Sequence, residues 1–273
     1  MSNRKFPVLE MFVSIQGEGR FTGYPSLFVR LGGCNLRCVF GNSRCDTPYS
    51  SFELDKPICT TVKEAVAKAE SLLMANPHVD HIVITGGEPM LYKDAIMEFL
   101  DGDLGEKVIT IETNGTLPAL MPWENSDTFE CGIDLWSISP KLSTSVDKDL
   151  KYLTPEMRDN HDRIRINIDN LASYYDSMMA TKEEISENAN LQFKFVYSGP
   201  ESVTEIEDIL EQISIKTDTT IGWLSRYVML MPEGTTNDQL GAISQECAQV
   251  CIDKGWTFCD RLHIRIWGDK RGV

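Results

Sequence analysis

The sequence predicts an α/β protein with a mainly parallel sheet. Short apolar runs alternate with amphipathic helical stretches along the chain, an order typical of parallel strands joined by helical crossovers. Several apolar runs also end in glycine or a polar turn, as buried strands do where they leave a sheet. The 273 residues show no repeat and no linker, so a single domain is expected over residues 1–273.

The predicted strands are short apolar runs, the first of which, SLFVRLGG, leads into a loop that holds three cysteines. Strands are predicted at 26–33, 81–89, 107–116, 132–141, 191–199, 225–234 and 256–268. Because the carboxyl ends of parallel strands meet at one edge of a sheet, the polar residues that follow these strands are expected to gather there.

Amphipathic stretches connect the strands, and helices are predicted at 60–77, 93–100, 202–215 and 237–255. The first begins at a threonine and is closed by Pro77. The third carries a predicted capping box of Ser202 and Glu205. Residues 142–190 are charged and contain the helix-like patch IDNLASYYDSMMA, so this segment is interpreted as an insertion or a lid.

The charge balance indicates which classes of partner the protein can bind. There are 26 Lys and Arg residues against 41 Asp and Glu, which gives a net charge of −15. A binder of nucleic acid backbones needs a cationic face, so this class of partner is not expected. No apolar run is long enough for a signal peptide or a membrane span. We therefore expect a soluble cytoplasmic protein without a membrane partner.

Three of the eight cysteines, Cys34, Cys38 and Cys45, lie in a loop rich in Gly, Asn and Ser after the first strand. Disulfides are not expected in a reducing cytoplasm. Zinc takes four protein ligands, or three plus water, whereas a 4Fe–4S cluster held by three thiolates leaves one iron open. Three cysteines without a fourth nearby favour the cluster, with zinc or unligated thiols as the alternative. Small buried side chains are predicted for Cys131, Cys247, Cys251 and Cys259.

Motifs follow the next strands: TGGEP after the second, ETNGT after the third and SPK after the fourth. Together with the three-cysteine loop they resemble the radical S-adenosylmethionine (SAM) superfamily. Within it, VSIQGEGRFTGYPSLFVRLGGCNLRC, ITGGEP, IETNGT, SISPK and LHIRIWGDKRGV resemble the 7-carboxy-7-deazaguanine synthase (QueE) family. The resemblance is close over residues 10–141 and looser in the final third.

The resemblance implies a fold and a division of the chain. The fold would be the partial (βα)6 barrel of radical SAM enzymes, with an insertion around 142–190. Residues 1–59 would form the substrate and cluster loop region, and residues 256–273 a tail at the substrate site.

The resemblance also implies an activity. The family converts 6-carboxy-5,6,7,8-tetrahydropterin to 7-carboxy-7-deazaguanine by ring contraction with loss of ammonia, which makes it a carbon–nitrogen lyase of queuosine-type 7-deazapurine biosynthesis. Its cofactors are a 4Fe–4S cluster, SAM and Mg²⁺. A flavodoxin or ferredoxin as electron donor and a homodimer are expected as partners.

Cluster and magnesium ligands carry over by position. Cys34, Cys38 and Cys45 would hold the cluster, and Thr47 matches the Mg²⁺ ligand. The usual family spacing is CxxxCxxC, whereas here VFGNSR separates Cys38 from Cys45. The longer loop is tolerable, and Cys59 is the alternative third ligand.

The resemblance also assigns the SAM and substrate contacts. SAM would be bound by Gly86, Gly87, Glu88, Thr113, Asn114, Ser139 and Lys141. The substrate would be bound by Gln16, Glu18, Arg30, Gly87, His263, Trp267 and Val273. Carboxamide and carboxylate groups match the donor–acceptor edge of a pterin, and an arginine pairs with the substrate carboxylate.

Two alternatives remain open. A glycyl-radical activase also begins with a three-cysteine loop, but it would lack the SIQGEG and LHxxIWG segments present here. A non-catalytic iron–sulfur redox or scaffold protein would need neither TGGEP nor SPK, so the complete set of motifs speaks against it.

Overall fold

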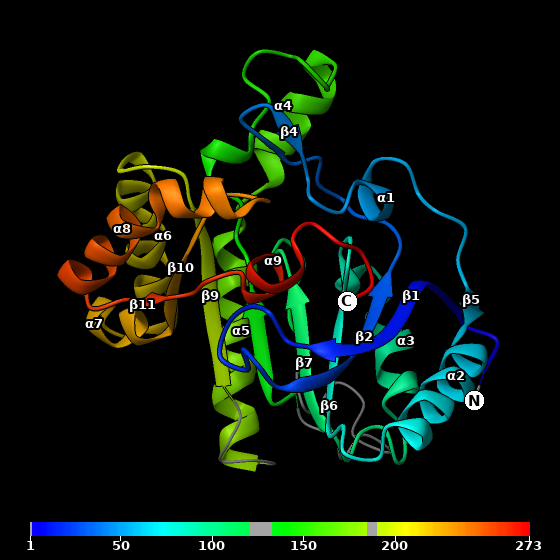
Figure 1. Cartoon of the computed structure of the whole chain (residues 1–273). Coiled ribbons are helices and arrows are strands. Elements are labelled where there is room, and N and C mark those ends of the chain that lie inside the picture. The colour runs from blue at the N-terminus through cyan, green and yellow to red at the C-terminus, as the bar shows by residue number, and fades with distance from the viewer. Residues whose placement is uncertain (1, 121–132, 185–189) are drawn as a thin grey trace.

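The computed structural model describes residues 2–120, 133–184 and 190–273, and its centre is one large sheet (Figure 1). Six parallel strands form most of it: β2 (Pro25–Leu31), β6 (His81–Gly86), β7 (Val108–Thr113), β8 (Leu135–Ile138), β9 (Asn190–Tyr197) and β10 (Val228–Pro232). The predicted α/β class is therefore confirmed.

Other strands extend the sheet at its two sides. Strand β1 (Lys5–Ile15) pairs antiparallel with β2 and with β5 (Cys59–Thr61), while β11 (Thr257–Phe258) pairs parallel with β10. The strand order is β11-β10-β9-β8-β7-β6-β2-β1-β5. Since β5 and β11 are different edges, the sheet is open within the described residues and does not close into a barrel there.

Apolar β-branched residues explain the central strands. In β6, Ile82, Val83 and Ile84 are all fully buried, as expected for a parallel strand covered on both faces. Each such side chain contributes roughly 1.5–3 kcal/mol by leaving water. Strand β2 pairs in register with β6, so Leu27 lies opposite Ile82.

Helices cover the sheet along its length: α2 (Val62–Ala75), α3 (Lys93–Phe99), α5 (Ile168–Glu184), α6 (Glu201–Thr217) and α8 (Asn237–Lys254). The capping of α2 is complete, because the Thr61 side chain accepts from the Glu64 amide and the Glu64 side chain accepts from the Thr61 amide. The capping box predicted for α6 is wrong. This helix begins at Glu201, so Ser202 lies inside its first turn and cannot be the N-cap.

The strand predicted at 256–268 is also largely wrong. Only Thr257–Phe258 pair with β10, and Leu262–Trp267 form helix α9. The alternating pattern LHIRIW looks like a strand, but short apolar runs do not distinguish a strand from a helix. Ile264 is buried but Ile266, two positions on, is exposed, so the run lacks the burial alternation of a strand, and the helix ends at Trp267, followed by Gly268 with φ of +70°.

The segment 142–190 contains the crossover that any βαβ unit requires. Helix α5 lies between β8 and β9 in the chain, and its Leu171, Tyr174 and Met178 are buried in the main core. Between β8 and α5, the same segment also forms a 3₁₀ turn at Ser143–Ser145 and helix α4 (Pro155–Ile164). In Figure 1, α4 lies beside strand β4 (Ser43–Arg44).

Cys247, Cys251 and Cys259 are buried, as predicted. Cys131 lies outside the described residues. None of the helices in the described ranges has the length and apolar character needed to span a bilayer.

Candidate active site

A cavity of about 530 Å³ lies where the parallel strands end. It is lined by residues of the β2, β6, β7, β8 and β10 ends, the N-terminal segment and the chain terminus. The predicted site residues that line it are Gln16, Glu18, Arg30, Cys34, Cys38, Cys45, Thr47, Gly86, Gly87, Thr113, Asn114, Ser139, Lys141, His263 and Val273. Two do not, Glu88 and Trp267.

The segment between Cys38 and Cys45 is a small antiparallel hairpin of β3 (Val39–Phe40) and β4, which meet at Gly41 and Asn42. Gly41 has a φ of +52°, a value that tight hairpin turns need and glycine adopts without strain. The Cys45 amide donates to the Cys38 carbonyl at 2.9 Å. The long spacing therefore returns the two cysteines to neighbouring positions.

The two glycines of TGGEP bring the end of β6 against the cluster loop. A Cβ on Gly87 would lie 2.0 Å from the Gly33 carbonyl oxygen, and one on Gly86 would lie 2.1 Å from the Leu31 carbonyl oxygen. Gly86 also has a φ of +135°. These glycines are needed because main chain meets main chain here, one residue before Cys34.

Burial raises the pKa of the Cys34 thiol to about 12 and also raises the pKa values of Cys38 and Cys45. The three thiols are thus neutral at pH 7, and any metal group they bind must displace their protons. Within the described ranges, no three Cys, His, Asp or Glu side chains lie close enough together to hold a single metal ion. Three thiols are a soft donor set, which suits iron–sulfur chemistry.

Glu88 is fully buried behind the cavity. Its carboxylate accepts from the Met90 amide at 2.9 Å, the Thr113 hydroxyl at 2.8 Å and the Asn114 amide at 2.7 Å. These contacts tie the end of β6 to the end of β7. The geometry thus places Glu88 as a support for Thr113 and Asn114, and it does not bring its carboxylate to the cavity surface.

Glu18 lies among cations. Its carboxylate contacts Lys194 Nζ at 2.5 Å and Arg261 Nε at 2.9 Å, and His263 Nε2 is 3.9 Å away. Burial alone would raise the pKa of Glu18, but Lys194, Arg261 and His263 outweigh it and hold the pKa well below its usual value. Glu18 is therefore ionised at neutral pH.

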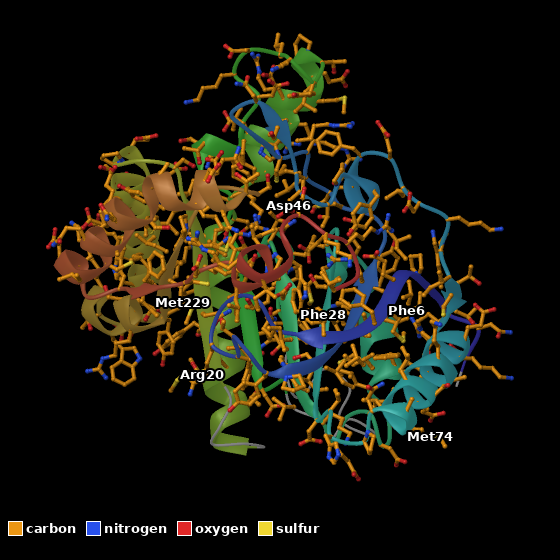
Figure 2. The ribbon with its side chains drawn as sticks, in the orientation of Figure 1. Phe6, Arg20, Phe28, Asp46, Met74 and Met229 are labelled. Carbon is orange, nitrogen blue, oxygen red and sulfur yellow. The ribbon has the colours of Figure 1, made fainter. Side chains whose placement is uncertain are left out.

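Arg261 joins three parts of the site. Besides Glu18, it contacts Asp46 Oδ2 through Nη2 at 2.6 Å and donates from Nη1 to the Gly234 carbonyl at 2.7 Å. Asp46 lies between the β3–β4 hairpin and α9 in Figure 2. Arg261 lowers the pKa of Asp46, although burial acts in the opposite direction.

Gln16 is also fixed on both sides. Its Nε2 donates to Glu112 at 3.1 Å, and its Oε1 accepts from the Glu18 amide at 3.1 Å. The Thr85 hydroxyl donates to the other oxygen of Glu112 at 2.8 Å. Glu112 lines the cavity and joins β6, β7 and the N-terminal segment.

Arg30 is held by Glu10, with Nε at 2.8 Å from Oε2. Arg271 binds the other oxygen of Glu10 and stacks its guanidinium 3.6 Å above the centre of the Tyr49 ring. These contacts fold the last described residues over β1, where Val273 reaches the cavity.

The end of β8 contributes a lysine and a serine. Lys141 Nζ donates to the Ser139 hydroxyl at 2.7 Å, and both line the cavity. Asn114, at the end of β7, donates to Asn35 of the cluster loop at 3.0 Å. Three neighbouring strand ends and the cluster loop thus meet at one side of the cavity.

Comparison with known proteins decides the family. Residues 28–188 match the radical SAM superfamily. The 7-carboxy-7-deazaguanine synthase of Halobacterium salinarum is 38% identical over 268 residues, which cover 96% of this chain and 91% of the relative. That of Rhodopirellula baltica is 34% identical over 274 residues, covering 97% and 88%. This chain belongs to the 7-carboxy-7-deazaguanine synthase family.

A solved structure agrees with the fold. The crystal structure of QueE from Escherichia coli matches with a TM-score of 0.59 and 20% identity over 95% of both chains. Because the relatives that match nearly the full chain are synthases, the activase and the non-catalytic alternatives lose their support.

Membership in the radical SAM superfamily implies a 4Fe–4S cluster and SAM. The residues of this synthase family member fit such a cluster, because Cys34, Cys38 and Cys45 line the same cavity as the strand ends. Sequence reasoning missed Glu112, Lys194 and Arg261. A lysine inside the apolar strand LQFKFVY and an arginine next to LHIRIWG were the available signals.

Proposed function

We propose that this chain converts 6-carboxy-5,6,7,8-tetrahydropterin to 7-carboxy-7-deazaguanine with loss of ammonia. One observation carries the proposal. A single cavity joins the three cysteines and the ends of β6, β7 and β8 to a second group of polar residues around the ionised Glu18. A radical SAM reaction on a polar heterocycle needs both parts in one enclosed space.

Cys34, Cys38 and Cys45 would hold the 4Fe–4S cluster. When bound and reduced, the cluster supplies the electron that cleaves SAM to a 5′-deoxyadenosyl radical. The chain itself orients SAM and excludes water. The residues proposed to contact SAM are Gly86, Gly87, Thr113, Asn114, Ser139 and Lys141, with Glu88 holding the ends of β6 and β7 from behind.

The substrate would bind at the second group. The ionised carboxylate of Glu18 accepts from the N–H groups of a pterin, and the fixed carboxamide of Gln16 lies next to it. Arg30 pairs with the substrate carboxylate and is pre-oriented by Glu10. His263 completes this side, within 3.9 Å of Glu18. Trp267 was also predicted at the substrate, but it does not line the cavity and is left out of the proposed contacts.

Mg²⁺ is proposed at Thr47. Its hydroxyl lies 3.5 Å from Cys45 Sγ, and the residue lines the cavity between the cluster loop and the substrate side. A hydroxyl with substrate oxygens and waters is a suitable set of ligands for this hard, hydrated cation.

The remaining expectations stay proposals as well. A flavodoxin or ferredoxin would supply the electron, the active form would be a homodimer, and the protein would work in the cytoplasm. The product would enter queuosine-type or another 7-deazapurine biosynthesis.

An anaerobic assay tests the function. The protein is reconstituted with iron and sulfide and given dithionite, SAM and 6-carboxytetrahydropterin, and 5′-deoxyadenosine and the deazapurine are followed by mass and absorbance. Both products are expected. 5′-Deoxyadenosine without the deazapurine would overturn the substrate, and neither product with the cluster present would overturn the whole proposal.

A further inference from the structure

Residues 143–164 have no role in the site described above, yet they contact the hairpin that the long spacing between Cys38 and Cys45 forms. Helix α4 lies beside the β3–β4 hairpin in Figure 1. Hydrogen bonds join the two segments at the tip of the hairpin and again beside Cys38.

At the tip, Tyr152 donates from its hydroxyl to the Asn42 carbonyl at 2.5 Å, and Lys151 Nζ donates to the Asn42 side chain at 3.0 Å. The turn that presents them is fixed by Asp147, which is 3% exposed. Its carboxylate accepts from the amides of residues 151–153 at 2.7–3.0 Å. Tyr152 and Lys151 thus hold the tip of the hairpin, and the Asp147 carboxylate fixes the turn that carries them.

Beside Cys38, the contact is made by His161, which is 1% exposed. The Arg37 amide donates to His161 Nδ1 at 3.2 Å. An amide N–H can only donate, so Nδ1 is unprotonated and the ring proton is on Nε2. Nε2 lies 3.1 Å from the Ser145 hydroxyl and donates to it, and that hydroxyl donates to the Leu142 carbonyl at 2.7 Å.

This chain of hydrogen bonds runs from Arg37, in the cluster loop, to Leu142, just after β8. Arg37 precedes Cys38, and its guanidinium donates to the Cys34 carbonyl at 2.8 Å. At the other end, Leu142 follows Lys141, which is bonded to Ser139. The imidazole therefore connects the loop of the cysteines to the end of β8, where the SAM contacts are proposed.

We propose that His161 is a positioning residue for the iron–sulfur cluster, fixing the Cys34–Cys45 loop relative to the end of β8, with Tyr152 and Lys151 holding the hairpin tip. Residues 143–164 are then a brace for a cluster loop that is longer than the family pattern. The inference rests on the ligand assignment proposed above.

Three substitutions of His161 test its two hydrogen bonds, to the Arg37 amide and to the Ser145 hydroxyl, one at a time. His161→Asn keeps an acceptor near the Nδ1 position, His161→Gln keeps a donor near the Nε2 position, and His161→Leu keeps neither. Each variant is loaded with iron and sulfide, and the loss of visible absorbance to an iron chelator is timed without oxygen. The EPR spectrum of the reduced cluster is recorded with and without SAM.

Cluster loss is expected to be roughly three- to ten-fold faster in the Leu and Gln variants, because both remove the acceptor of the Arg37 amide beside Cys38 and leave that buried donor unpaired. It is expected to stay close to wild type in the Asn variant, which keeps this acceptor and loses only the bond to Ser145, whose hydroxyl still donates to the Leu142 carbonyl. The change that SAM causes in the EPR spectrum is expected to weaken in the Leu variant and return in the Asn variant. If His161 served folding alone, the variants would change the thermal unfolding temperature, and the Asn variant would not restore the cluster-loss rate or the EPR change. The exposed His78→Asn is the matched control and should change nothing.

Wild-type loss rates and spectra in the Leu variant would overturn the proposal, as would an Asn variant that folds normally but behaves like Leu. If the Leu variant does not fold, Tyr152→Phe decides, because it removes only one partly exposed hydroxyl. A loss rate unchanged by Tyr152→Phe would then overturn the brace. Full cluster loading in Cys45→Ala would instead overturn the ligand assignment. The His161 variants do not test that assignment, so the two failures can be told apart.

Discussion

The amide of Cys45 donates to the carbonyl of Cys38 across the base of the β3–β4 hairpin at 2.9 Å. Six intervening residues therefore leave the two cysteines as cross-strand neighbours. Cys59, the alternative third ligand, is buried in β5, pairs with Val8 of β1 and does not line the cavity. The geometry favours Cys45.

Replacing Cys45 is expected to prevent assembly of the cluster. Cys45→Ala should lose the cluster after reconstitution, while Cys59→Ala should retain about four irons per chain. Iron and sulfide analysis with the visible spectrum measures both. A Cys45→Ala protein with full iron content would show that the assignment is wrong.

Replacing Arg261 by lysine is expected to destabilise the protein. One ammonium cannot span both Glu18 and Asp46, so one of these charge-assisted hydrogen bonds is lost; because Glu18 keeps Lys194 and Asp46 is 39% exposed, the cost is about 1.5 kcal/mol in the free energy of unfolding. Urea unfolding of the metal-free protein measures this. The matched control is Arg158→Lys, whose ion pair with Asp159 is on the surface and should change stability by less than about 0.5 kcal/mol.

His81 is expected to make stability depend on pH. It is buried between the hydroxyls of Ser26 and Thr110, and burial lowers its pKa from 6.5 to about 4. Between these values the unfolded chain binds more protons, so the stabilisation is complete above pH 6.5 and is lost as pH falls toward 4. About 2 kcal/mol should be lost between pH 6.5 and pH 5.

Urea unfolding of wild type and His81→Gln at several pH values tests this. The glutamine does not titrate, so the stability advantage of wild type should shrink by that amount on acidification. The exposed His78→Gln should keep the wild-type pH dependence. Parallel curves for wild type and His81→Gln would contradict the prediction.

The features that could be predicted from the sequence are those set by a local residue pattern. Ile82, Val83 and Ile84 marked a buried strand, and Gly86 and Gly87 marked its end at the cavity. Burial of Glu88 was not visible, because its three donors come from the turn after β6 and from the next strand. A carboxylate in a motif looks the same in sequence whether it faces a ligand or the chain.

Long-range pairs were the main omission. Lys194 and Glu18 are 176 positions apart, and no periodicity connects them. The same holds for Arg261, whose partners Asp46 and Glu18 come from two other segments. Local sequence could name Glu18 by resemblance, but only the folded chain shows the cations that keep it ionised.

Thr47 provides a test of the Mg²⁺ proposal. The Thr47 side chain does not cap helix α1 (Pro48–Ser51), and its carbonyl is fixed by the side chains of Ser50 and Ser51. Thr47→Ala should therefore fold normally while losing the proposed ligand. The Mg²⁺ concentration for half-maximal turnover should rise roughly ten-fold or more, and Thr47→Ser should restore it. Steady-state assays over a Mg²⁺ series measure this, with thermal unfolding as the control for folding. An unchanged Mg²⁺ concentration for half-maximal turnover in Thr47→Ala would show that Thr47 is not a ligand of the ion.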